Sequence, residues 1–243
     1  MTKTTAIAFA LMALSSAAQA HQIWIEPADQ RAVIRFGEFG DNLREASPGL
    51  LDKFVAPSAT LISARGDKTA AGVKTANGFT LPFGAAAGES VIAQEASYPI
   101  STFKRGDKEV SSWYYPAARL VTDFAPQQPK LPLDLVPTGE AGAFKLFFQG
   151  KPLPKTKVAL VTQSGWAKEA NTDEHGVVKF DLPWKGTYVA EVHHNDQTPG
   201  ERNGAKGAER YTAVSYVTSV TYIKADGVDP IPAPPAANPS PAK

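Results

Sequence analysis

The chain contains no cysteine, and its two methionines, Met1 and Met12, both lie near the start. The absence of cysteine excludes disulfide bonds, thiolate metal ligands and cysteine nucleophiles. The position of the methionines argues against a copper(I) site built from thioethers in a mature exported chain. Histidine is also scarce, with 4 residues in 243. Any metal site or catalytic base must therefore use a very small set of side chains.

Long apolar runs are missing as well. A membrane-spanning helix needs about 20 apolar residues, and no run approaches that length. The clearest run, residues 6–14, follows the basic Lys3 and precedes Ala18-Gln19-Ala20, which is the pattern of a signal peptide and its cleavage site. We therefore predict a signal peptide over residues 1–20 and a soluble product in the periplasm.

Neither sign of charge is in excess. Without residues 1–20 the chain loses Lys3, which leaves 24 basic residues against 24 acidic ones. Nucleic-acid binding requires a basic surface, and peripheral membrane anchoring often uses a polybasic segment. The balance therefore predicts no nucleic-acid partner and no direct insertion into a membrane.

The remaining sequence consists of short alternating apolar runs, interrupted by turn dipeptides such as Asn77-Gly78 and Gly106-Asp107. This pattern predicts an all-β protein. Residues 50–54, which follow Ser47-Pro48, are the one candidate for a short helix.

Proline divides the chain into parts. Four prolines in residues 124–138 predict an extended crossing between an N-terminal β domain, residues 21–123, and a second unit, residues 139–225. The second unit has the short strands of a β-sandwich of immunoglobulin or transthyretin-like type, so we expect a two-part β-sandwich. Six prolines and no aromatic residue in residues 226–243 predict a disordered, extended tail.

Two stretches carry a resemblance to a known family. The first is HQIWIEP with IRFGEFGDNLREASPGLLDKF, and the second runs from GKPLPKTKVALVT to TDEHGVVKFDLPWKGTYVAEVHHND. Together they resemble a family of exported bacterial domains of unknown function, grouped with periplasmic components of nickel and cobalt uptake systems. The second half also resembles transthyretin-like and carboxypeptidase-regulatory domains. The resemblance covers residues 21–223 and implies a periplasmic β-sandwich that binds a divalent transition metal.

His21 becomes the first residue if cleavage follows Ala20. Its α-amino group, with an unperturbed pKa of about 7.7–8.0, and its imidazole, at about 6.5, can then both act as neutral nitrogen ligands. One further imidazole completes a planar set of three nitrogens, which suits copper(II) or nickel(II). The resemblance adds cobalt, and the metal stays open among the three.

The neighbouring pair His193 and His194 offers the third nitrogen. Adjacent residues of a strand point to opposite faces, so His194 shares a face with Val192, and His193 shares the other face with Glu191. Glu191 and Trp24 are candidates to support the ligands. We favour His193, although a bulge at the strand end reverses this choice. His175 lies in a turn and is interpreted as a surface residue.

These observations predict a periplasmic protein that captures copper, nickel or cobalt at its processed N-terminal histidine and passes the ion to an uptake or handling system. A membrane transporter component is the expected partner. One alternative is an adaptor β-sandwich that binds a membrane partner through its tail or a sheet edge. A second is a copper-dependent oxidative enzyme with an N-terminal histidine ligand.

Overall fold

The structure is a computed structural model that describes residues 21–204 and 207–241, so the predicted signal peptide lies outside the described residues. These residues form strands throughout, with one 3-10 helix, η1 (Leu50–Lys53), where the short helix is expected. Within them no helix is long and apolar enough to cross a membrane. The all-β class is confirmed.

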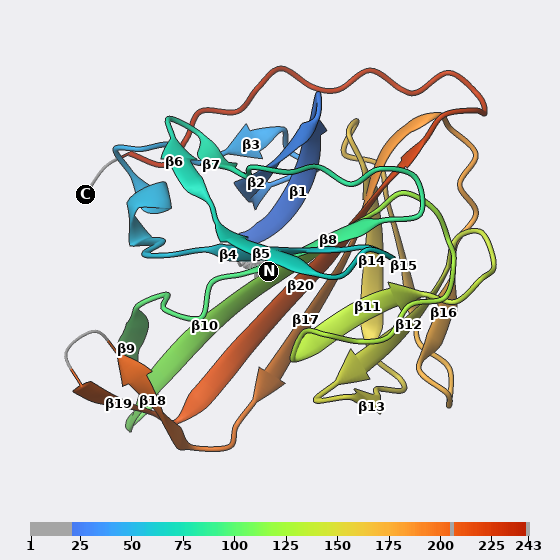
Figure 1. Cartoon of the computed structure of the whole chain (residues 1–243). Coiled ribbons are helices and arrows are strands. Elements are labelled where there is room, and N and C mark those ends of the chain that lie inside the picture. Colours follow the sequence, from blue (N-terminus) through green and yellow to red (C-terminus); the bar gives the residue numbers. More distant parts are fainter. Residues whose placement is uncertain (1–20, 205–206, 242–243) are drawn as a thin grey trace, which may run out of the picture.

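A nine-stranded sheet forms the centre of the molecule (Figure 1). It contains strands from both halves of the chain, and another layer covers each of its faces. In spatial order its strands are β15 (Ala167–Asn171), β14 (Lys157–Thr162), β17 (Gly186–Asp196), β20 (Ala213–Lys224), β10 (Lys108–Val121), β8 (Ser90–Gln94), β4 (Ser58–Ile62) and β5 (Lys68–Ala71), with β9 (Ile100–Arg105) paired to β10.

The two halves meet at β10 and β20, which pair in parallel from Ser112 opposite Ala213 to Val121 opposite Tyr222. The units that the sequence predicts as residues 21–123 and 139–225 thus share one continuous sheet. Local patterns do not indicate this junction, because the paired segments lie about 100 residues apart in the chain.

A small N-terminal sheet covers one face of the central sheet. Its apolar residues, including Ile23 and Ile34, pack against Ala118 and Leu120 of β10. The first two strands are joined as an antiparallel hairpin in which Gln22 lies opposite Gly37. The strands are β1 (Gln22–Ala28), β2 (Arg31–Glu38), β7 (Gly78–Thr80) and β6 (Val73–Thr75), with β3 (Leu43–Arg44) on the free side of β2 near its end.

A second small sheet covers the opposite face. Leu135 and Phe144 of this sheet pack with Val192 and Val220 of the central sheet, so the β-sandwich architecture is confirmed for the second half. The strands are β11 (Leu133–Pro137), β12 (Ala143–Phe148), β13 (Lys151–Pro152) and β16 (Val177–Lys179), and a separate hairpin is formed by β18 (Gly200–Gly204) and β19 (Gly207–Tyr211).

Two proline-rich segments form part of the packed structure. The crossing over residues 124–138 ends in the edge strand β11, where a proline-rich sequence can pair on one side. The tail beyond β20 is extended and runs across the top of the molecule in Figure 1. Backbone and side-chain hydrogen bonds fix it at several points, whereas its composition alone predicts a disordered end.

Candidate metal site at the amino terminus

His21 directly precedes β1 and lies against the central sheet. The hydroxyl of Tyr114, on β10, donates a hydrogen bond to the His21 carbonyl oxygen. The imidazole packs beside the ring of Phe36, with centroids 5.2 Å apart, and 14% of the side chain is exposed. The ring is therefore held in place by its neighbours but remains open to solvent on one side.

Two carboxylates face the two ring nitrogens of His21. Nε2 lies 2.6 Å from Oε1 of Glu45, and Nδ1 lies 3.5 Å from Oε1 of Glu38. The pairing of the first strands explains this geometry, because Glu38 ends β2 opposite the start of β1 and Glu45 follows β3, which pairs with that same end of β2. Three segments of the chain thus converge on one imidazole.

The two carboxylates have different electrostatic environments. Burial acts to raise the pKa of Glu45, but hydrogen bonds from His21 and Ser240 outweigh it, and the pKa lies below its usual range. Burial raises the pKa of Glu38, the adjacent Asp41 raises it further, and His21 opposes them. Glu38 Oε1 is buried and has no hydrogen-bond partner among the described residues. This oxygen is therefore available to a further positive group or donor.

Glu191 extends the acidic cluster from β17. Gln22 donates a hydrogen bond from Nε2 to Glu191 Oε1, which connects the start of β1 to the central sheet. Burial raises the pKa of Glu191 to about 7, with the negative charge of Glu38 contributing and the Gln22 hydrogen bond opposing. The carboxyl groups of Glu38 and Glu191, whose pKa values are both raised, therefore hold protons more readily than exposed acids do.

The histidine pair on β17 is divided between two faces. The register with β20 is unbroken from Gly186 to Asp196, so the bulge that would exchange the two faces does not occur. His194 packs on Phe148, with ring centroids 4.4 Å apart, on the face of the second sandwich. His193 lies two residues from Glu191, has an exposed side chain, and shares the Glu191 face. No hydrogen bond or ring contact within the described residues joins either histidine to His21.

The contacts of Trp24 and His175 indicate structural roles. Trp24 is fully buried against Phe39 and Val189, and its Nε1 donates a 3.0 Å hydrogen bond to Glu26. His175 is exposed, and its backbone N–H donates to the Asp173 carboxylate in a tight turn.

The chain belongs to the DUF4198 family. The model of this family, described as a domain of unknown function, matches residues 18–196. No curated protein matches the chain. The DUF4198 match contains His21, both carboxylates that face it, Glu191 and the histidine pair. It ends with β17, so β20 and the tail lie beyond it.

Glu38 and Glu45, the two carboxylates that face His21, were not predicted as site residues from the sequence. Acidic residues are frequent between positions 26 and 45, and such acids are usually solvated. The signal that could have found Glu38 is the hairpin of the first two strands, since a turn at Asp29-Gln30 fixes the register that places Glu38 opposite the start of β1.

The described side chains do not by themselves form a cluster of three or more histidine, cysteine or acidic groups suited to hold a metal ion. In His21 the two ring nitrogens point to different carboxylates. A metal site here therefore needs a ligand beyond these side chains, and the α-amino group of a processed His21 is the nearest chemical source.

Proposed function

We propose that this chain is a periplasmic protein that captures a transition metal ion at its processed N-terminal histidine and passes it to an uptake or handling system. The ion is copper, nickel or cobalt. The proposal includes export by the N-terminal segment and a membrane transporter component as the receiving partner. The resemblance to periplasmic components of nickel and cobalt uptake systems, and to transthyretin-like domains in the second half, supports it.

The observation that carries the proposal is the environment of the His21 imidazole. A histidine that binds a metal through one nitrogen usually donates its other N–H to a carboxylate or carbonyl, which fixes the ring and its tautomer. Glu45 accepts from Nε2 in this way and is fully buried. Nδ1, the nitrogen that chelates together with an α-amino group, is left on the side of Glu38.

We assign Glu38 as the third ligand, in addition to the amine and Nδ1. Its buried Oε1 lacks a hydrogen-bond partner among the described residues and lies 3.5 Å from Nδ1. A mixed nitrogen and oxygen set accommodates copper(II), nickel(II) and cobalt(II). His193 and His194, the third ligands considered from sequence, have no hydrogen bond or ring contact with His21 within the described residues. Trp24 and Glu191 are the residues that the sequence suggested as supports for the ligands. Trp24 donates a hydrogen bond to Glu26, and Glu191 accepts one from Gln22.

Titration calorimetry with copper(II), nickel(II) and cobalt(II) tests the assignment on the mature chain that begins at His21. A form whose His21 α-amine is acetylated has lost the chelating amine and should bind at least about a hundredfold more weakly. Glu38→Gln should cost about tenfold or more, while Glu109→Gln, an exposed acid on β10, should change nothing. Equal affinity of the acetylated form would show that the N-terminal site is wrong.

The histidine pair provides the discriminating variants. With Glu38 as the third ligand, His193→Ala and His194→Ala each leave the affinity near that of the native chain. A loss in His193→Ala as large as that in His21→Ala would assign the third position to an imidazole instead. Since metal displaces protons from the ligands, affinity should also fall steeply below about pH 6.

A further inference from the structure

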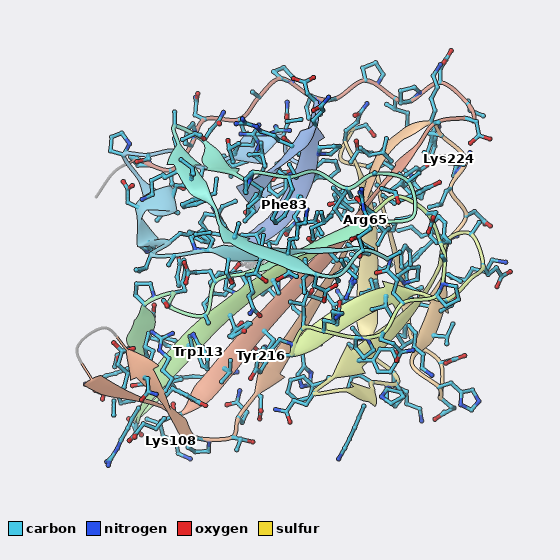
Figure 2. All side chains as sticks on the ribbon, viewed as in Figure 1. Arg65, Phe83, Lys108, Trp113, Tyr216 and Lys224 are labelled. Atoms are coloured by element: carbon cyan, nitrogen blue, oxygen red, sulfur yellow. The ribbon has the colours of Figure 1, made fainter. Side chains whose placement is uncertain are left out.

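The C-terminal segment connects two distant parts of the molecule. It starts after Lys224, which Figure 2 shows at the opposite end of the long central strands from Lys108. Val228 forms its first attachment, because its N–H donates to Pro183 O at 2.9 Å and its carbonyl accepts from Lys185 N at 2.9 Å. From there the segment crosses to the N-terminal sheet (Figure 1).

The second attachment is to the edge strand β3. Asn42 donates from Nδ2 to Pro234 O at 2.8 Å, and the Asn42 carbonyl accepts from Ala237 N at 3.3 Å. Leu43 and Ala237 form an isolated parallel bridge. The segment thus lies along the side of β3 that β2 leaves free, much as an added strand does at a sheet edge.

The third attachment reaches the His21 site itself. Ser240 donates from its backbone N to Glu45 Oε2 at 2.9 Å and from Oγ to Glu45 Oε1 at 2.7 Å. Oε1 is the same oxygen that lies 2.6 Å from Nε2 of His21. Ser240 and His21 therefore share one fully buried carboxylate.

The composition and packing of the segment favour local opening of this attachment. Its six prolines have no N–H to donate, and they favour an extended conformation without internal hydrogen bonds. A hollow of about 300 Å³, lined by Glu26, Asn42, Arg44 and Ala233 among others, lies beside it. Few hydrogen bonds and incomplete packing are the properties of a segment that opens locally without unfolding the protein.

We infer that residues 226–241 form a strap that closes over His21, with Ser240 as a positioning residue that holds Glu45 against the imidazole. The strap controls how fast a ligand enters and leaves the His21 site. This last role rests on the proposed metal-binding function, whereas the closure itself does not.

Chemical labelling tests the closure without any metal. Diethyl pyrocarbonate acylates accessible imidazole nitrogens, and mass spectrometry of the mature chain reports His21 and the exposed His175 separately. Deleting residues 238–243 removes Ser240 but keeps the attachments at Val228 and Ala237. The rate at His21 relative to His175 should then rise about tenfold.

Ser240→Ala is the finer variant, because it removes one of the two hydrogen bonds and should give a smaller rise. Ser63→Ala, which removes a hydroxyl from a surface turn at Gly66, is the matched control and should give none. Unchanged labelling of His21 in both the deletion and Ser240→Ala would overturn the strap.

Release of bound copper(II) to a chelator in a stopped-flow experiment tests the control of exchange. The deletion should release the ion about tenfold faster than the native chain and than Ser63→Ala. Equal release rates would refute control of exchange by the strap. If the native mature chain binds none of the three metals, the proposed function fails, and the labelling result still decides whether the strap exists.

Discussion

At the scale of single residues, the region around His21 shows how burial and hydrogen bonding set the charge of an acid. Glu45 is buried, yet its pKa is lowered because His21 and Ser240 supply donors. Glu191 has one neutral donor and a negatively charged neighbour, so burial dominates and raises its pKa to about 7. Glu45 and Glu191 can therefore differ in charge at one pH.

Glu191 gives a pH-dependent prediction. Its pKa is raised from 4.5 to about 7 on folding, so between these values the folded chain binds a proton that the unfolded chain has lost. The free energy of unfolding should therefore fall as pH rises from about 4.5 to 7, with a contribution on the order of 3 kcal/mol. Glu191→Gln should reduce this fall.

Urea denaturation of the metal-free protein at pH 5 and pH 8 measures the effect. The exposed control Glu109→Gln should keep the native difference between the two pH values. If Glu191→Gln shows the same difference as the native chain, the raised pKa is not a determinant of stability.

At the scale of elements, the ion pair between Arg119 of β10 and Asp134 of β11 attaches the second small sheet to the central one. Arg119 donates from Nε at 3.0 Å and from Nη2 at 2.5 Å, and both side chains are fully buried. Asp134 also accepts from the backbone N–H groups of Lys130 and Leu131, so it orders the end of the proline-rich crossing.

Asp134→Ala should lower the free energy of unfolding by about 3–5 kcal/mol, because it leaves a buried guanidinium without its carboxylate. Asp67→Ala removes an ion pair with Lys130 in which both partners are about 40% exposed, and should cost less than about 1 kcal/mol. Chemical denaturation of both variants makes the comparison, and similar losses in the two would contradict this role of the buried pair.

Local sequence patterns predicted most strands and turns, but not the pairing between segments that are distant in the chain. The alternation around His193 and His194 gave the correct faces because β17 pairs with β20 without interruption. The turn signals and the 3-10 helix at Leu50 were likewise set by neighbouring residues. The contact of Ser240 with Glu45 and the meeting of Glu38 with His21 depend on pairing between distant segments, and residue preferences do not encode such pairing.

At the scale of the whole molecule, the central sheet makes the two halves one structural body. The two largest hydrophobic cores of the described residues both use residues of β10, with Leu120 in the first core and Val121 in the second. Loss of either half therefore exposes apolar surface on the other.

Calorimetry of the mature chain should accordingly give a single unfolding transition, because breaking the pairing of β10 with β20 disrupts both cores together. A polypeptide limited to residues 139–225 lacks β10 and should not unfold cooperatively when expressed alone. Two resolved transitions in the intact chain, or cooperative unfolding of the isolated segment, would show that the halves are independent domains.

The parallel pairing of β10 with β20 also has a consequence for the order of folding. Ser112 and its partner Ala213 are separated by a long stretch of chain that includes the whole second small sheet. During synthesis β10 therefore cannot pair with β20 until nearly the entire polypeptide has been made. Such non-local pairing slows folding, since a large loop must close before the contact forms. Under the proposed export in an unfolded state, late closure of the central sheet would leave the nascent polypeptide able to cross the membrane.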